Sequence, residues 1–141
     1  MESFPCAGFA REETNMPGAV KELIGKLETA DIILTSASPW DEKASLYKNT
    51  GLNSEYFPKL SESVGLISGI FLDANGKEVL GKYTTIGLGY KGFIKAAERG
   101  AVILMCGGED RREILYSSLK ARMVSTLITT SKTAKMLLKA I

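Results

Sequence analysis

Apolar residues recur along the chain at spacings that predict alternating helices and strands. Four of them show the i, i+3, i+4, i+7 spacing of one buried helix face: Val20, Leu23, Ile24 and Leu27. Pro17 supplies a start signal, so we expect a helix over residues 17–29. Residues 32–35, the run Ile-Ile-Leu-Thr, follow directly and are typical of a parallel strand buried on both faces.

The middle of the chain predicts loops and a hairpin. Residues 36–50 are polar and are expected to form the loop that leaves the first strand, and residues 53–60 a short amphipathic helix. Residues 64–72 are small or β-branched, and the Asn75-Gly76 pair that follows is typical of a tight turn. This pattern predicts a β-hairpin that returns through Val79.

The last third is the most regular part and alternates helix-like and strand-like segments. It predicts a helix that ends at Gly100, with Phe93, Ile94 and Ala97 on one face, and then a strand over 101–105. A helix over 109–122 follows, with Ile114, Leu115 and Leu119 inward. A strand over 125–129 and a last helix capped by Ser131 complete the pattern. This order predicts an α/β domain: a three-layer parallel sheet flanked by helices, with the hairpin as an insertion.

Composition narrows the possible functions. The 141 residues carry 18 Lys and Arg against 16 Asp and Glu. A net charge of only +2 is too small to attract nucleic acid, so we expect no direct contact with it. The sequence contains no His, which excludes Ser-His and Cys-His nucleophile pairs and every His-based metal site. We therefore expect no metal and no cofactor. Cys6 and Cys106 match no metal-ligand spacing, and reduced thiols are expected.

No apolar run reaches the roughly 18 residues of a membrane span, and the first residues lack a signal-peptide layout. We therefore expect a cytoplasmic protein that does not contact the membrane. Residues 1–16 mix charge, Gly and Pro without a period and predict an irregular lead-in. Residues 17–141 are then one domain.

The turn after the strand over 101–105 is the first candidate site. In open α/β sheets, ligands bind at the carboxyl ends of strands, where the first N–H groups of the next helix are unpaired. Gly107 and Gly108 allow a ligand oxygen to approach the backbone, Glu109 begins the helix, and Arg111 places a guanidinium just inside it. The turn can hold a phosphate. The alternative is a tight turn followed by solvated arginines.

Two further turns are candidates. Residues 87–92 read G-x-G-x-x-G and resemble a dinucleotide-binding fingerprint, with Glu109 near the usual acidic position. The preceding segment 82–86 makes a poor buried strand, however, and only 49 residues follow Gly92, too few for a second dinucleotide-binding half. Residues 128–132, which read Ile-Thr-Thr-Ser-Lys, can bind an anion through their hydroxyls or simply cap a helix.

Four other residues have a functional and a plain structural interpretation. Trp40 can cover a pocket, although packing explains a single Trp equally. Cys106 stands at a strand end without a base partner, so we expect an inert buried thiol. Asp41 and Glu42 are paired carboxylates in the sequence, but adjacent side chains usually point apart, and loop solvation explains them.

Four strings of the sequence occur in the order of one known family: ADIIL at 30–34, FLDANG at 71–76, CGGEDRREIL at 106–115 and STLITT at 125–130. Through these strings the chain resembles the effector-sensing, sugar-binding domain of SorC-type bacterial transcriptional regulators. The resemblance covers the chain from about Val20 to the end. The family is similar in fold to ribose-phosphate isomerase and glucosamine-phosphate deaminase, and its members bind phosphorylated sugars or related effectors.

The resemblance also assigns residues. Arg111 takes the place of the family's phosphate-contacting Lys, with Gly107 and Gly108 as the turn, although a planar guanidinium is not equivalent to an ammonium. Leu66 stands where relatives often present an acidic residue to the sugar hydroxyls. The helix-turn-helix head and the first half of the effector domain have no counterpart before residue 17, so a homo-oligomer or a second subunit that supplies the missing half is expected.

Three functions follow from this comparison. The first is a non-catalytic domain that binds a phosphorylated sugar at the Gly107-Gly108 turn. The second is an interaction or regulatory protein that pairs with full-length relatives and binds no effector. The third is a small enzyme, either a sugar-phosphate isomerase or a dinucleotide-dependent oxidoreductase, which the lack of an acid/base pair disfavours.

Overall fold

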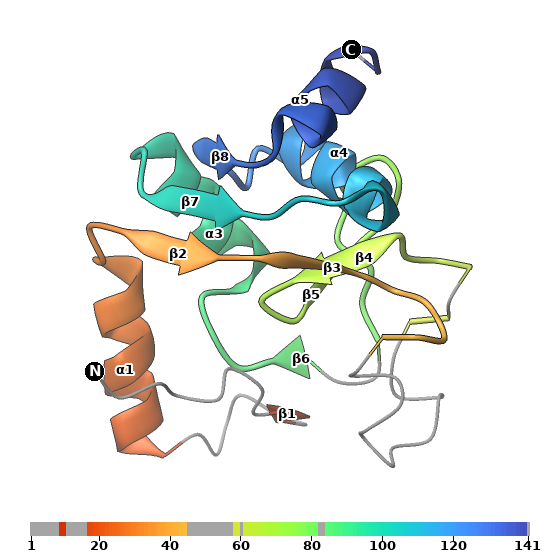
Figure 1. Cartoon of the computed structure of the whole chain (residues 1–141). Coiled ribbons are helices and arrows are strands. Elements are labelled where there is room, and N and C mark those ends of the chain that lie inside the picture. The colour runs from red at the N-terminus through yellow and green to blue at the C-terminus, as the bar shows by residue number, and fades with distance from the viewer. Residues whose placement is uncertain (1–8, 11–16, 45–57, 60, 82–83, 141) are drawn as a thin grey trace.

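The computed structural model of the chain describes residues 9–10, 17–44, 58–59, 61–81 and 84–140 (Figure 1). Its helices are α1 (Gly18–Glu28), α3 (Gly89–Glu98), the 3₁₀ turn η3 (Glu109–Arg111), α4 (Arg112–Lys120) and α5 (Ser131–Leu138). Its strands are β1 (Phe9–Ala10), β2 (Ile33–Thr35), β3 (Ala37–Pro39), β4 (Gly65–Ile67), β5 (Ile70–Leu72), β6 (Thr84–Thr85), β7 (Val102–Met105) and β8 (Thr126–Ile128). The predicted α/β class, with helices flanking a parallel sheet and an antiparallel hairpin, is confirmed.

The parallel sheet has the order β2-β7-β8, with Leu34 opposite Ile103 and Met105 opposite Ile128. It forms because α3 precedes β7 and α4 connects β7 to β8, as in other βα units. The predicted helices over 17–29 and 109–122 and the strands over 101–105 and 125–129 are confirmed within a few residues. All three strands end at the same edge of the sheet.

The second sheet is antiparallel and has the order β3-β4-β5. The hairpin prediction is confirmed, but it contains two turns instead of one. Ser68 and Gly69, both at positive φ, connect β4 to β5. The Asn75-Gly76 turn then leads back to Val79, whose amide donates to the Phe71 carbonyl at 2.8 Å. A further two-residue pair, β1-β6, is also antiparallel.

The core lies between one face of the parallel sheet, helices α3 and α4, and the antiparallel sheet. Val102, Leu104, Ile114, Leu115 and Leu72 are all fully buried there. α4 packs so closely on β4 that a Cβ atom at Gly65 would lie 2.6 Å from the Ile114 Cβ. Glycine at this position therefore permits the helix to touch the strand backbone.

Three predictions need correction or fall outside the described residues. Residues 36–39 are not all loop, because β3 pairs with β4. The strand over 32–35 is not buried on both faces: Leu34 is 64% exposed and Ile32 is 66% exposed, since no described helix covers that side. Thr130, not Ser131, caps α5, because its Oγ1 accepts the Thr133 amide. The helix predicted over 53–60 lies almost entirely outside the described residues.

The turn after β5 is fixed to the end of α4. Ser117 Oγ donates to the Asp73 carbonyl at 2.7 Å, and Tyr90 Oη donates to the Gly76 carbonyl at 2.8 Å. Gly76 has φ of +82°, and a Cβ added there would lie 2.7 Å from the Ala121 amide nitrogen. Both the backbone angle and the close approach therefore require glycine at this position.

We predict that Gly76→Ala lowers the free energy of unfolding by about 2–4 kcal/mol, from left-handed strain plus overpacking. Urea denaturation followed by circular dichroism measures this change. The matched control is Gly25→Ala inside α1, where an added Cβ meets nothing within 4 Å. It should stabilise the protein by about 0.5–1 kcal/mol. An equal response of both variants would contradict the role given to Gly76.

Candidate functional site

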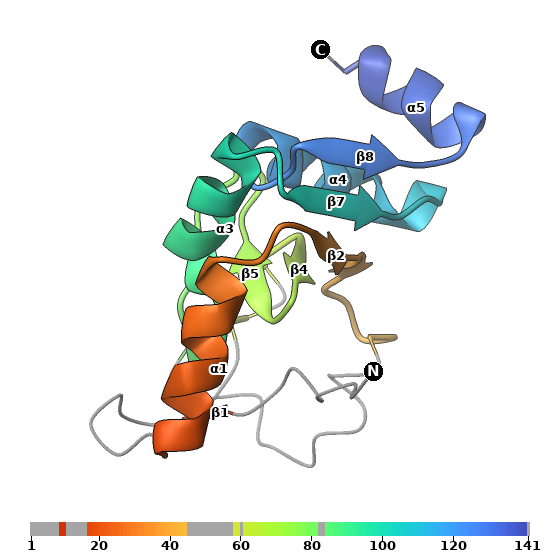
Figure 2. The ribbon, with the colours of Figure 1, turned by 90° about the vertical axis from the view of Figure 1, so that its left-hand side faces the viewer.

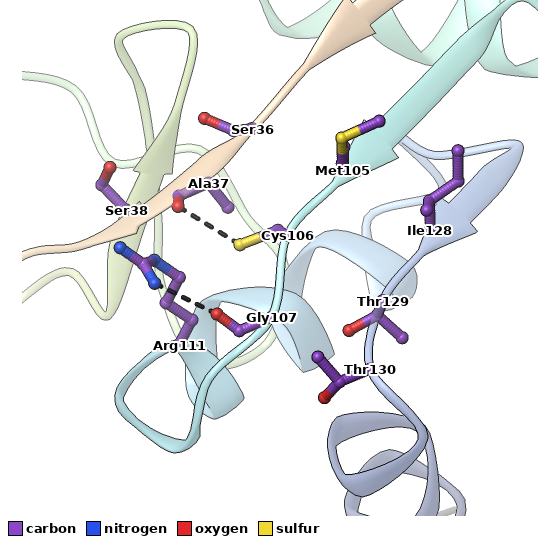
Figure 3. A pocket seen from close by; sticks show the side chains of 10 residues that line it. All are labelled: Ser36, Ala37, Ser38, Met105, Cys106, Gly107, Arg111, Ile128, Thr129 and Thr130. Carbon is purple, nitrogen blue, oxygen red and sulfur yellow. Dashed lines mark hydrogen bonds between the residues drawn. The ribbon is translucent and has the colours of Figure 1, made fainter.

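A pocket of about 470 Å³ lies where β2, β7 and β8 end (Figure 3). Its lining comes from the last residues of β7 and β8, from the segments that follow the three strands, and from the last residue of the helical segment η3. The lining residues are Ser36, Ala37, Ser38, Met105, Cys106, Gly107, Arg111, Ile128, Thr129 and Thr130. The volume lies within the range of small-molecule sites in proteins, roughly 300–1,000 Å³.

Gly107 lines one wall of the pocket, and Gly108 continues the same turn outside the lining. Gly108 has φ of 125°, which a side chain would strain, and its amide donates to Thr133 Oγ1 at 3.1 Å. A Cβ at Gly107 would lie 3.3 Å from Thr129 Oγ1, so glycine lets the two chain segments approach each other. One of the two turn amides is therefore already used to join the turn to α5.

Arg111 extends from η3 to the pocket wall, as Figure 3 shows. Its Nη1 donates to the Gly107 carbonyl at 3.1 Å, and the same atom lies 3.9 Å from Asp110 Oδ2. The side chain is 38% exposed, so its remaining donors stay accessible. Among the described lining residues, Arg111 is the one that carries a charge, and none of them has a carboxylate.

Four hydroxyl residues complete the polar part of the lining: Ser36, Ser38, Thr129 and Thr130. The Thr130 hydroxyl already accepts the Thr133 amide as the N-cap of α5. Thr129 Oγ1, in contrast, is buried and has no hydrogen-bond partner among the described residues. An unsatisfied buried hydroxyl costs about 1–3 kcal/mol, and this one lies beside Gly107 at the pocket wall.

Three residues assigned to the site from the sequence lie outside this lining: Gly108, Glu109 and Leu66. Glu109 points to α5, where its Oε1 accepts from Lys132 Nζ at 2.6 Å. The hydrogen bond from Lys132 and the charge of that lysine lower the pKa of Glu109. Leu66 packs with Trp40 and Phe71 instead, because alternation along β4 directs it away from the face that Gly65 and Ile67 share.

The other candidates have structural partners. Cys106 is 9% exposed and its Sγ donates to the Ala37 carbonyl at 3.4 Å, in agreement with a buried thiol at the pocket. Trp40 is 4% exposed, and its Nε1 donates to the Pro58 carbonyl at 3.0 Å. Asp41 Oδ1 accepts the Lys43 amide. Within the described ranges, no cluster of three metal-ligating side chains occurs.

The G-x-G-x-x-G segment lacks the setting of a dinucleotide site. The strand before it, β6, pairs antiparallel with β1 and does not belong to the parallel sheet. Gly89 starts α3 at φ of +68°, and Gly92 makes room for the Leu88 side chain, which a Cβ would approach to 2.6 Å. These glycines therefore allow the close packing at the start of α3. A dinucleotide phosphate binds where a strand of a parallel sheet ends at the start of a helix, and β6 is not such a strand.

Sequence reasoning missed Ser36 and Ser38, which were assigned to a solvated loop. Their alternation around Ala37, which is 3% exposed, was the available signal for a strand. It also treated the Gly107 turn and residues 128–132 as separate candidates. The structure brings Gly107, Thr129 and Thr130 together in one pocket.

The fold and the pocket define a class of protein, an α/β domain with a pocket at the carboxyl ends of its parallel strands. The chain belongs to the Sugar-bind family, described as "Putative sugar-binding domain", whose model matches residues 10–139. The resemblance seen in the sequence is therefore confirmed. No curated protein sequence is similar enough to count as a match.

Solved structures of transcriptional regulators share the fold. A DeoR family regulator from Listeria monocytogenes has a TM-score of 0.72 and 21% identity, over 86% of this chain and 49% of that chain. The full-length sorbitol operon regulator SorC from Klebsiella pneumoniae has a TM-score of 0.64 and 19% identity, over 86% and 40%. The chain thus spans about half the length of these regulators or somewhat less. None of the described helices has the length and apolar content of a membrane span.

We predict that Thr129→Val raises the free energy of unfolding of the ligand-free protein by about 1 kcal/mol, because it removes an unsatisfied buried hydroxyl at nearly constant volume. Thermal or urea denaturation measures the change. Thr133→Val is the matched control: its hydroxyl bonds with the Gly108 amide and with Thr130, so the same replacement should destabilise by about 1–2 kcal/mol. Destabilisation by both variants would mean that Thr129 has a partner.

Proposed function

We propose that the chain is the effector-sensing part of a SorC- or DeoR-type regulator and binds a phosphorylated sugar in the pocket at the ends of β2, β7 and β8. The observation that carries the proposal is the Arg111 guanidinium in a pocket whose described lining residues include no carboxylate. Family membership supports a sugar as the ligand, and the pocket chemistry supports an anionic group on it. The role is non-catalytic, and the protein acts in the cytoplasm.

Arg111 supplies most of the anion recognition. Of its five N–H donors, one bonds with the Gly107 carbonyl, and that bond orients the guanidinium. The planar group can then form two parallel, charge-assisted hydrogen bonds to phosphate oxygens. The Gly108 amide is bonded to Thr133, so the glycines serve mainly to bring the backbone close to the ligand. Glu109, paired with Lys132, joins η3 to α5 and supports the turn from outside.

The sugar hydroxyls have partners on the opposite walls. Hydroxyl groups come from two segments: Ser36 and Ser38 lie in the β2–β3 segment, and Thr129 follows the end of β8. Such groups donate and accept, as sugar hydroxyls do, and Thr129 has no competing partner among the described residues. Met105 and Ile128 provide an apolar wall for the C–H surface of the ring.

A second candidate function is an interaction protein without an effector. It is favoured by Leu66, which packs into the Trp40 and Phe71 cluster where relatives often carry an acidic group for the sugar. Without an acidic group at this position, the contacts to the sugar hydroxyls come from Ser36, Ser38 and Thr129. An enzymatic function is disfavoured because the part of the pocket lining that the structure describes offers no acid/base pair.

Calorimetric titration with a panel of sugar monophosphates and bisphosphates, and with NAD, tests the proposal. We expect one sugar phosphate to bind and Arg111→Ala to weaken it at least about tenfold, because charge-assisted hydrogen bonds contribute about 1.5–3 kcal/mol. Thr129→Val should also weaken binding while it stabilises the free protein.

Arg112→Ala is the matched control, since Arg112 is the next residue, is exposed and does not line the pocket. Its affinity should stay unchanged. Saturable NAD binding would support the dinucleotide alternative instead, and silence of the whole panel would support the interaction protein. Equal losses in Arg111→Ala and Arg112→Ala would reduce the effect to net charge and contradict a specific site.

A further inference from the structure

The guanidinium group of Arg111 has a carboxylate of the same turn beside it. Asp110 precedes Arg111 in η3, and its Oδ2 lies 3.9 Å from Arg111 Nη1. The Asp110 side chain is 62% exposed, and the residue does not line the pocket. The charged group that the pocket offers to a ligand therefore has a counterion of the protein just outside the lining.

Gly108 leaves the space in which these two side chains meet. A Cβ at Gly108 would lie 2.5 Å from Asp110 Oδ1 and 3.4 Å from Arg111 Nη1. Both side chains thus fold back over the same backbone position, which has no side chain of its own. The Gly107 carbonyl accepts from the same Nη1 at 3.1 Å. The carbonyl and carboxylate oxygens of the turn therefore gather at one nitrogen of Arg111, and its other donors remain for a ligand.

The surroundings of the turn show the same pattern of compensated charge. β7 and β8 run side by side and end at one edge of the sheet, where the chain turns back into α4 and α5 (Figure 2). Two acidic residues, Glu109 and Asp110, stand in η3 at this edge. Glu109 pairs with Lys132 of α5 at 2.6 Å, and Asp110 lies beside Arg111. Each of these two cations therefore has a carboxylate of the protein as its neighbour.

A carboxylate beside Arg111 weakens the attraction of the site for any anion. In water, the interaction of two unit charges about 6 Å apart changes a binding constant about threefold, and a doubly charged phosphate experiences the effect twice. Salt reduces the effect, because the screening length is roughly 10 Å at 0.1 M. Since Arg111 carries the one charge among the described lining residues, its counterion has a direct influence on the affinity for an anion.

We propose that Asp110 sets the affinity of the ligand site by partly neutralising Arg111. The inference rests on the proposed function, because it takes Arg111 as the residue that binds the anionic group, and it adds a residue that opposes this contact. A phosphate group alone then binds weakly. A ligand reaches high occupancy only if it also contacts the hydroxyl and apolar parts of the pocket, so Asp110 makes the site depend on the sugar as well as on the phosphate.

Glu113 separates this role from a purely structural one. Acidic side chains at the start of a helix stabilise it, whatever lies beside them. Asp110 stands in the first turn of η3 and Glu113 in the first turn of α4. Glu113 is exposed, does not line the pocket and forms no ion pair within the described part of the chain. Asp110→Asn and Glu113→Gln therefore remove the same charge from neighbouring turns, but only the first removes the counterion of Arg111.

A titration with inorganic phosphate, followed by nuclear magnetic resonance through the Gly107 amide signal, tests the proposal. We expect Asp110→Asn to bind phosphate at least about threefold more tightly than the unchanged chain at low salt. Glu113→Gln should give a clearly smaller gain. The gain of Asp110→Asn should also shrink when salt is raised to about 0.5 M, because screening shortens the reach of the lost charge. A purely structural role would change the free energy of unfolding and leave the affinity as it is.

An affinity that stays the same or falls in Asp110→Asn overturns the proposal, as does the absence of phosphate binding by this variant. An equal gain in Glu113→Gln also overturns it, because the effect would then be one of net charge. The test remains separate from that of the proposed function. If phosphate binds more tightly to Asp110→Asn but no sugar phosphate binds better than phosphate itself, the proposed function is wrong and the role of Asp110 stands. If a sugar phosphate binds and Asp110→Asn changes nothing, only the role of Asp110 is wrong.

Discussion

The close contact of α4 with the antiparallel sheet holds the two sheets and the pocket in their relative positions. Two positions without a Cβ permit it, Gly65 against Ile114 and Gly76 against the end of the helix. α4 follows η3 directly, so whatever fixes the helix also fixes Arg111 at its start. The same helix joins β7 to β8 and sets their register. The pocket is therefore formed by the packing of a helix whose own residues hardly enter it.

Most elements were predictable from the sequence because their periodicity is local. The apolar pattern that places Ile114 and Leu115 inward needs only the helical repeat, and Gly100 ends its helix at φ of +79° as expected. The predictions that were wrong concern residues whose structure depends on segments far away in the sequence. β3 is three residues long and contains Pro39, and its pairing with β4 depends on a distant segment. A short strand of this kind leaves no local signal strong enough to outweigh a loop.

The candidate site divides in the same way. The glycine pair and Arg111 were visible as a strand-to-helix turn, and Thr129 and Thr130 as a separate helix start. Their union depends on the parallel register that sets Met105 opposite Ile128, which no local pattern contains. The unsatisfied hydroxyl of Thr129 is likewise a property of its surroundings. The family resemblance placed Leu66 near the sugar, yet the side-chain alternation of β4 decides where that residue points.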